Sequence, residues 1–165
     1  YDIGLEMKRR ARTQINGQGL QDALKGERLI RDACAIAIRG DARAALDGFR
    51  AGLELVDDDP LGVAGLAYSN FMVAQAQGGS KSVAIRSLEK IETLLRTNDS
   101  FPEIFLFLGR IHRSLNAFDQ AEDAFKRALK INPHFAEAGS ELRHIKRLME
   151  QSDSGIRGLF SRKKR

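Results

Sequence analysis

The side chains that most often carry chemistry in proteins are few and scattered in this sequence. Its one cysteine is Cys34, and its histidines are His112, His134 and His144. A cysteine becomes a nucleophile when a base or a cation lowers its pKa, whereas the apolar neighbours of Cys34 over 33–36 raise it. We therefore expect Cys34 to be inert and structural. The histidines do not fall into a spacing that would bind zinc.

Two further stretches could attract ions or phosphates, and neither has the spacing that this requires. Three aspartates stand together at 57–59, but a calcium-binding EF-hand loop needs spaced oxygen ligands, a central glycine and a closing glutamate. Gly78-Gly79 is followed by Lys81-Ser82, but the full phosphate-loop motif is absent. We therefore expect no catalytic residue, no metal and no cofactor, and we predict that the chain is not an enzyme.

The composition is that of an ordinary globular protein of one domain. Of the 165 residues, 42% are apolar and 30% are charged, which is the balance of a chain that folds around a core in water. No apolar run reaches the length of a membrane span, and no hydrophobic signal segment stands at the start. A single cysteine fits a reducing compartment, so we expect a cytoplasmic location. Because the first residue is Tyr1 and not methionine, we expect a piece of a longer protein.

The net charge of +5 is concentrated towards the C-terminal end. Eight Lys and Arg residues and only two acids lie between Arg143 and Arg165, so the rest of the chain is close to neutral. Residues 151–165 show no periodicity and are predicted to form a basic, disordered tail. Its last four residues are candidates for a peripheral contact with an anionic membrane; they are Arg162, Lys163, Lys164 and Arg165. Nucleic acid is a less favoured partner because few aromatic residues are available for stacking, and the tail could equally be only a soluble end.

The apolar pattern that must position any binding surface is clearest between Pro102 and Pro133. Ile104, Leu108 and Ile111 recur at spacings of four and three, which predicts a helix with one apolar face, and Asn116 is its expected stop. A second apolar stripe predicts another helix that ends at Pro133; its residues are Ala121, Ala124, Phe125, Ala128, Leu129 and Ile131. One such helix pair cannot bury its own apolar face and needs neighbours.

Residues at fixed offsets in this stretch resemble the tetratricopeptide repeat (TPR), a helix–turn–helix unit of 34 residues. The positions that agree in type are Phe105, Leu108, Gly109, Ala121, Phe125, Ala128 and Pro133. His112 departs from the pattern, since the family prefers tyrosine there. The resemblance implies an all-α fold, an α-solenoid of about three TPR-like helix–turn–helix repeats, and a role in binding proteins.

Two weaker repeats are predicted before this one. A turn at Gly40-Asp41 separates helices over 21–39 and 42–56, and a second unit with its first index at Gly65 runs over 65–97. We expect loops over 57–64, where Pro60 should prevent helix, and over 97–101. After Pro133, one more amphipathic helix has no partner and is predicted to be a C-terminal cap.

An amphipathic helix is predicted over 3–15, followed by a break at the glycine-containing residues 16–19. We expect this helix to pack on the first repeat; the alternative is a surface helix for anionic lipid or nucleic acid. The predicted organisation is therefore an N-terminal helix and linker over 1–25, a repeat domain with its capping helix over 26–150, and the tail over 151–165.

In the family that the sequence resembles, the first helix of each repeat lines a concave groove in which partner segments bind. Carried over by resemblance, this groove would be apolar at one end and basic at the other, and would suit an amphipathic, acidic peptide or helix. Its candidate residues are Ile30, Cys34, Ile38, Leu66, Ser69, Asn70, Val73, Gln77, Leu106, Arg110, Arg113, His144 and Arg147. Some of the apolar ones could instead be covered by the 3–15 helix.

One subfamily binds the C-terminal carboxylate of chaperones through lysine, asparagine and arginine side chains. Of its five positions only Asn70 agrees here, and the others are Ile30, Cys34, Glu103 and Phe107, which argues against this clamp. We predict an adaptor or scaffold that binds a protein segment. The alternatives are a self-assembling or membrane-associated scaffold that uses the tail, and a co-chaperone or secretion-chaperone module of a longer protein.

Overall fold

The computed structural model describes residues 3–79 and 81–162, with side chains from 17 to 152 apart from residue 80. This part of the chain forms seven helices and no strand. The helices are α1 (Ile3–Ile38), α2 (Ala42–Leu55), α3 (Pro60–Ala76), α4 (Lys81–Leu95), α5 (Pro102–Ser114), α6 (Phe118–Ile131) and α7 (Ala136–Arg162). The predicted all-α fold is confirmed.

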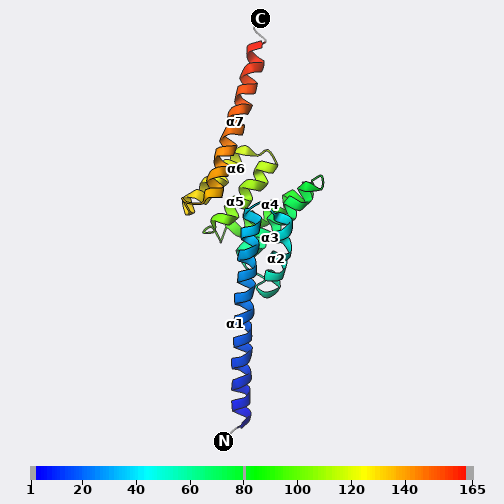
Figure 1. The fold of residues 1–165 in the computed structure, drawn as a ribbon, viewed down its shortest axis with the longest axis vertical. Coiled ribbons are helices and arrows are strands. Elements are labelled where there is room, and N and C mark those ends of the chain that lie inside the picture. Colours follow the sequence, from blue (N-terminus) through cyan, green and yellow to red (C-terminus); the bar gives the residue numbers. More distant parts are fainter. Residues whose placement is uncertain (1–2, 80, 163–165) are drawn as a thin grey trace.

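The helices lie in two layers. Helices α1, α3, α5 and α7 pack on one another in succession and form an inner layer, whereas α2, α4 and α6 form an outer layer. Each outer helix packs on the inner helix before it and on the one after it, while neighbouring outer helices do not pack closely together. This is the stack of helix pairs that the sequence predicts, with α7 as the capping helix, and its two terminal helices project from opposite ends of the body (Figure 1).

Phenylalanine side chains of the outer layer fill the space between the layers. Phe125 of α6 is fully buried over Gly109 of α5, and Phe49 of α2 is fully buried over Gly65 of α3. A Cβ atom at either glycine would overlap the ring, so the small residue is what lets the two helices approach. Within the inner layer, the rings of Tyr68 and Phe107 stack with their centroids 4.6 Å apart.

The three turns that join an inner helix to an outer one begin in the same way. Gly40, Gly78 and Asn116 have positive φ angles, and each donates its N–H to the carbonyl three residues earlier. The following N–H reaches the carbonyl five residues earlier, which is the Schellman pattern that ends a helix and satisfies its last carbonyl groups. Asn116 is therefore the helix stop that the sequence predicts.

The turn after α3 is one residue longer than the other two. It occupies residues 77–80, whereas the turns after α1 and α5 occupy 39–41 and 115–117. Gly78 and not Gly79 is thus the equivalent of Gly40 and Asn116. Counted back from this turn, the first position of the second repeat is the residue before Gly65. The repeat positions predicted for α3 are therefore wrong by one residue. The prediction assumed a turn of the same length in every repeat, whereas the turn after α3 has one residue more.

The break predicted at 16–19 is wrong, because α1 is continuous from Ile3 to Ile38. Glycine in a helix costs only about 1 kcal/mol, and a helix that has already formed is extended at little cost. Gly26 packs against Leu55 and Val56 at the end of α2, and before it α1 leads away from the body (Figure 1). The segment 3–15 therefore does not fold back on the first repeat, contrary to our expectation, and it cannot cover the inner helices of its own chain.

Two other predicted boundaries also differ from the structure. Pro60 does not stop a helix but begins α3, because proline suits the first helical turn and the Asp59 side chain accepts a hydrogen bond from the N–H of Gly62 at 2.7 Å. The loop expected over 57–64 is consequently short. The disorder predicted for 151–165 is wrong for 151–162, since α7 continues to Arg162 without a proline to stop it.

Candidate functional site

Five of the thirteen residues predicted to line the concave groove are buried between the inner helices. Ile30, Cys34, Ser69 and Leu106 are at most 4% exposed, and Ile38 is half-buried against both parts of the core. These helices pack directly on one another, so their facing side chains form core and not an open surface. Burial raises the pKa of the Cys34 thiol to about 12, with smaller contributions from Glu103 and Asp59, which agrees with the inert thiol predicted from the sequence.

Arg110, predicted to meet a partner, instead joins three inner helices. Its Nε donates to Glu141 Oε1 on α7 at 2.8 Å, and its terminal nitrogens donate to the carbonyl oxygens of Ala37 and Ile38 at 3.2 and 2.9 Å. Arg113 pairs with the other carboxylate oxygen of Glu141. Arg110 and Glu141 are both only 9% exposed. The guanidinium therefore neutralises a buried carboxylate and caps the carbonyl end of α1.

The remaining predicted residues are at least partly accessible but do not form one surface. Val73 and Gln77 line a small pocket of about 280 Å³ beside the turn after α1, and Leu66 and Asn70 belong to a larger groove. His144 and Arg147 are exposed on α7. The tail contacts predicted at Arg162, Lys163, Lys164 and Arg165 lie outside the side chains that the structure describes.

The larger groove, which we call the α2–α4 groove, lies on the outer layer over α3. It has a volume of about 600 Å³, within the range of ligand pockets. Its lining is Leu53 of α2, Val63, Leu66, Ala67 and Asn70 of α3, and Val83, Arg86, Ser87 and Lys90 of α4. The Ser87 hydroxyl donates to the carbonyl oxygen of Ala67 at 3.0 Å, which fixes α4 against the floor. The free surface is therefore apolar, with two cations and one amide at its edge.

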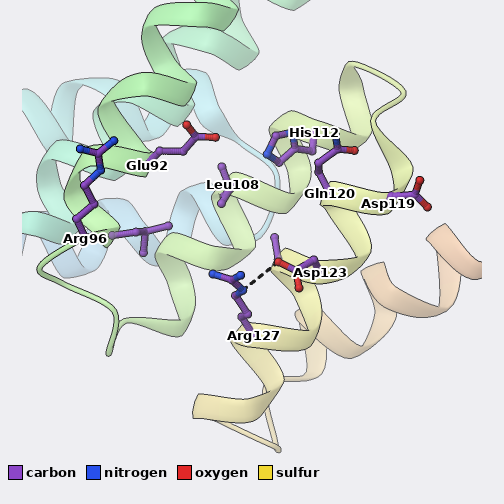
Figure 2. A pocket seen from close by; sticks show the side chains of 10 residues that line it. Glu92, Arg96, Leu108, His112, Asp119, Gln120, Asp123 and Arg127 are labelled. Carbon is purple, nitrogen blue, oxygen red and sulfur yellow. Dashed lines mark ion pairs between the residues drawn. The ribbon is translucent and has the colours of Figure 1, made fainter.

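A second groove, which we call the α4–α6 groove, has about the same size but a different lining. Its volume is about 540 Å³, and Figure 2 shows side chains of α4, α5 and α6 around it, among them Glu92, Leu108, His112 and Asp123. Burial lowers the pKa of His112, and the carboxylate of Glu92 opposes that shift. Asp123 forms an ion pair with Arg127, with Oδ2 and Nε 2.9 Å apart. This groove is lined mainly by polar side chains.

Most of the α2–α4 groove lies outside the residues predicted from the sequence, because the resemblance places binding residues only on the first helix of each repeat. Val83, Arg86 and Lys90 all lie on the second helix of their repeat. Their spacing of three and four places them on one face of α4, and that signal was present in the sequence.

Among the described residues, no group of three or more His, Cys, Asp or Glu side chains could hold a metal ion. Nor does any helix in the described ranges combine the length and the apolar character needed to cross a bilayer.

Comparisons with known proteins agree with this architecture. Residues 102–135 match the family model of the tetratricopeptide repeat, which confirms the resemblance seen in the sequence. The chain is similar in structure to the first TPR domain of human RPAP3, with a TM-score of 0.56 and 17% identity over 80% of this chain and 98% of that one. It is also similar to a thermophilic TPR protein of Thermus thermophilus, with a TM-score of 0.58 and 18% identity over 78% and 68% of the two chains.

A third similar structure contains a ligand. It is the first TPR of Spaghetti (RPAP3) bound to the HSP90 peptide SRMEEVD, with a TM-score of 0.53 and 18% identity over 78% of this chain and 95% of that one. At these identities the likeness establishes the fold of the chain. No curated protein sequence matches it.

Proposed function

We propose that this chain is a non-enzymatic interaction module that holds a segment of another protein in the α2–α4 groove. The observation that carries the proposal is the apolar lining of this groove, to which Leu53, Val63, Leu66 and Val83 contribute side chains that are only partly buried. When a partner side chain covers apolar surface in a groove, the burial stabilises the complex by about 25 cal/mol per Å² of apolar surface removed from water.

The inner layer gives less support to a binding role. Ile30, Leu106 and Phe107 are each at most 1% exposed, and Arg110 is occupied by Glu141 and by two carbonyl oxygens. A peptide could reach these side chains only by separating helices that pack on one another. The carboxylate clamp is disfavoured further, because the corrected register puts the buried Ser69, and not Asn70, at the position where the clamp has asparagine.

The test replaces Val83 with a photo-crosslinking amino acid and irradiates the chain in a lysate of its source cell. The matched control carries the same amino acid at Gln120, which has the equivalent place on α6 in the α4–α6 groove. We expect a protein to be captured from position 83 and not from position 120, and to be lost when Leu66→Glu places a charge in the groove. Capture that is equal at both positions, or capture only of a second copy of this chain, would contradict the proposal.

A further inference from the structure

The α2–α4 and α4–α6 grooves are equivalent parts of successive repeats. Helix α4 begins at Lys81 and helix α6 at Phe118, and both helices line their groove with residues at the same distances from these starts. Val83 corresponds to Gln120, Ser87 to Ala124, Arg86 to Asp123 and Lys90 to Arg127. The two grooves can therefore be compared residue by residue, as one site with two different linings.

In the α4–α6 groove, Asp123 and Arg127 of the outer helix α6 pair with each other. Asp123 and Arg127 stand one helical turn apart, and Arg127 Nε lies 2.9 Å from Asp123 Oδ2 (Figure 2). The guanidinium of Arg127 also lies 6.0 Å from the centre of the Phe105 ring. This cation thus has its partners within the chain, and an incoming ligand would have to displace them.

In the α2–α4 groove, the same two places hold Arg86 and Lys90. Both are exposed, and none of the residues that line this groove is acidic. Two like charges one turn apart on a helix repel each other and destabilise it slightly. A carboxylate brought close to both would relieve that repulsion, and its attraction would grow as the apolar walls exclude water.

We infer that the segment held in the α2–α4 groove carries apolar side chains together with acidic residues along the edge that faces Arg86 and Lys90. This inference rests on the proposed function and adds the chemistry of the partner. The apolar side chains would cover Leu53, Val63 and Leu66, and Asn70 would be available to hydrogen-bond the partner backbone. A segment without acids would leave the two cations unpaired at the edge.

The experiment measures the binding of fluorescent peptides by anisotropy, with peptide and protein concentrations extending to the millimolar range. The probes are a peptide of leucine and glutamate, a peptide of the same length and leucine pattern with glutamine in place of glutamate, and a single-stranded oligonucleotide. The proteins are the unaltered chain, the double variant Arg86→Gln with Lys90→Gln, and the matched variant Arg127→Gln in the other groove. Circular dichroism of each variant verifies that it is folded.

We expect the unaltered chain to bind the glutamate peptide more tightly than the glutamine peptide. Since exposed charge pairs are individually weak, the expected preference from two of them is about two- to tenfold, and it should shrink at high salt. The double variant should lose this preference, while Arg127→Gln should keep it. An unchanged preference in the double variant, or equal binding of the two peptides by the unaltered chain, overturns the inference.

Three further results separate this inference from the proposed function. If both peptides bind equally and Leu66→Glu abolishes both, the groove binds apolar segments and only the acidic character is wrong. If neither peptide binds and the photo-crosslinking amino acid at position 83 captures no protein, both proposals fail. If the oligonucleotide binds more tightly than either peptide and the double variant loses it, the cations serve phosphates, and the inference is overturned.

Discussion

Ser69 differs from the other buried polar residues of the described chain in lacking a hydrogen-bond partner for its hydroxyl. The side chain is fully buried on α3, and its Oγ has no donor or acceptor within reach. Ser87, by contrast, gives its hydroxyl proton to the carbonyl oxygen of Ala67. A buried hydroxyl without a partner loses its hydration and gains nothing in return.

We expect Ser69→Ala to raise the free energy of unfolding by about 1 kcal/mol, because it removes this uncompensated desolvation while keeping almost the same volume. Ser87→Ala is the matched control and should lower the stability by about 1 kcal/mol, because it breaks a real hydrogen bond. Urea unfolding followed by circular dichroism measures both. If the two substitutions shift the midpoint in the same direction, the hydroxyl of Ser69 has a partner in solution.

At the scale of the helices, the close approach of α5 and α6 depends on Gly109. Phe125 lies over this glycine and is fully buried. We expect Gly109→Ala to destabilise the chain by about 1–3 kcal/mol, although alanine favours helix, because the added methyl group must displace the ring. Gly139→Ala on α7 is the control, since the nearest atom to its added Cβ is the end of the Arg143 side chain at 3.5 Å.

The control should stabilise the chain by somewhat less than about 1 kcal/mol through helix propensity alone. Thermal or urea unfolding of both variants gives the comparison. Equal stabilisation by the two alanines would mean that the helices of the third repeat separate without cost.

Local residue patterns predicted which segments are helical and how they stack, but not the start of α3, the continuity of α1 or the extent of α7. Packing between adjacent helices is determined by the spacing of Ile104, Leu108 and Ile111 and by the small residue Gly109. A local residue pattern records such contacts directly. The extra residue after α3 left no signal, since Gly78 and Gly79 are equally able to adopt a positive φ. Continuity of α1 through Gly17 and Gly19 depends on extension of an existing helix, which residue type alone does not reveal.

At the scale of the whole molecule, the packing of the inner helices on one another buries part of the predicted groove. The resemblance placed Arg110 in an accessible groove, but the end of α1 approaches α5 closely enough for Arg110 to reach the carbonyl oxygens of Ala37 and Ile38. A contact between residues more than 70 positions apart cannot be read from any single repeat. The surface that stays open lies between the outer helices, which do not pack closely on one another.

We expect Arg110→Ala to lower the free energy of unfolding by about 3 kcal/mol or more. The substitution leaves the buried Glu141 with only Arg113 and uncaps the end of α1, and removing one member of a buried pair is strongly destabilising. Urea unfolding would measure the loss. Arg127→Ala is the control, because its ion pair is largely exposed and such pairs contribute less than about 1 kcal/mol.

The double variant Arg110→Ala with Glu141→Ala adds a second comparison. It should recover part of the loss, because no buried carboxylate then lacks its partner. A cost for Arg110→Ala as small as that for Arg127→Ala would show that the contacts of Arg110 contribute little to stability.

The position of Arg110 bears on the cooperativity of the array. In a linear stack each repeat touches only its neighbours, so the terminal repeats can unfold one at a time while the middle stays folded. Here one guanidinium is bonded to the first repeat through α1, belongs to the third through α5 and pairs with the cap through α7. Loss of either end deprives this buried guanidinium of part of its partners and thereby weakens the third repeat, on which the other end packs. We therefore expect the amides of α1 near Ala37 and those of α7 near Glu141 to exchange with solvent as a single unit, which hydrogen-exchange measurements would show.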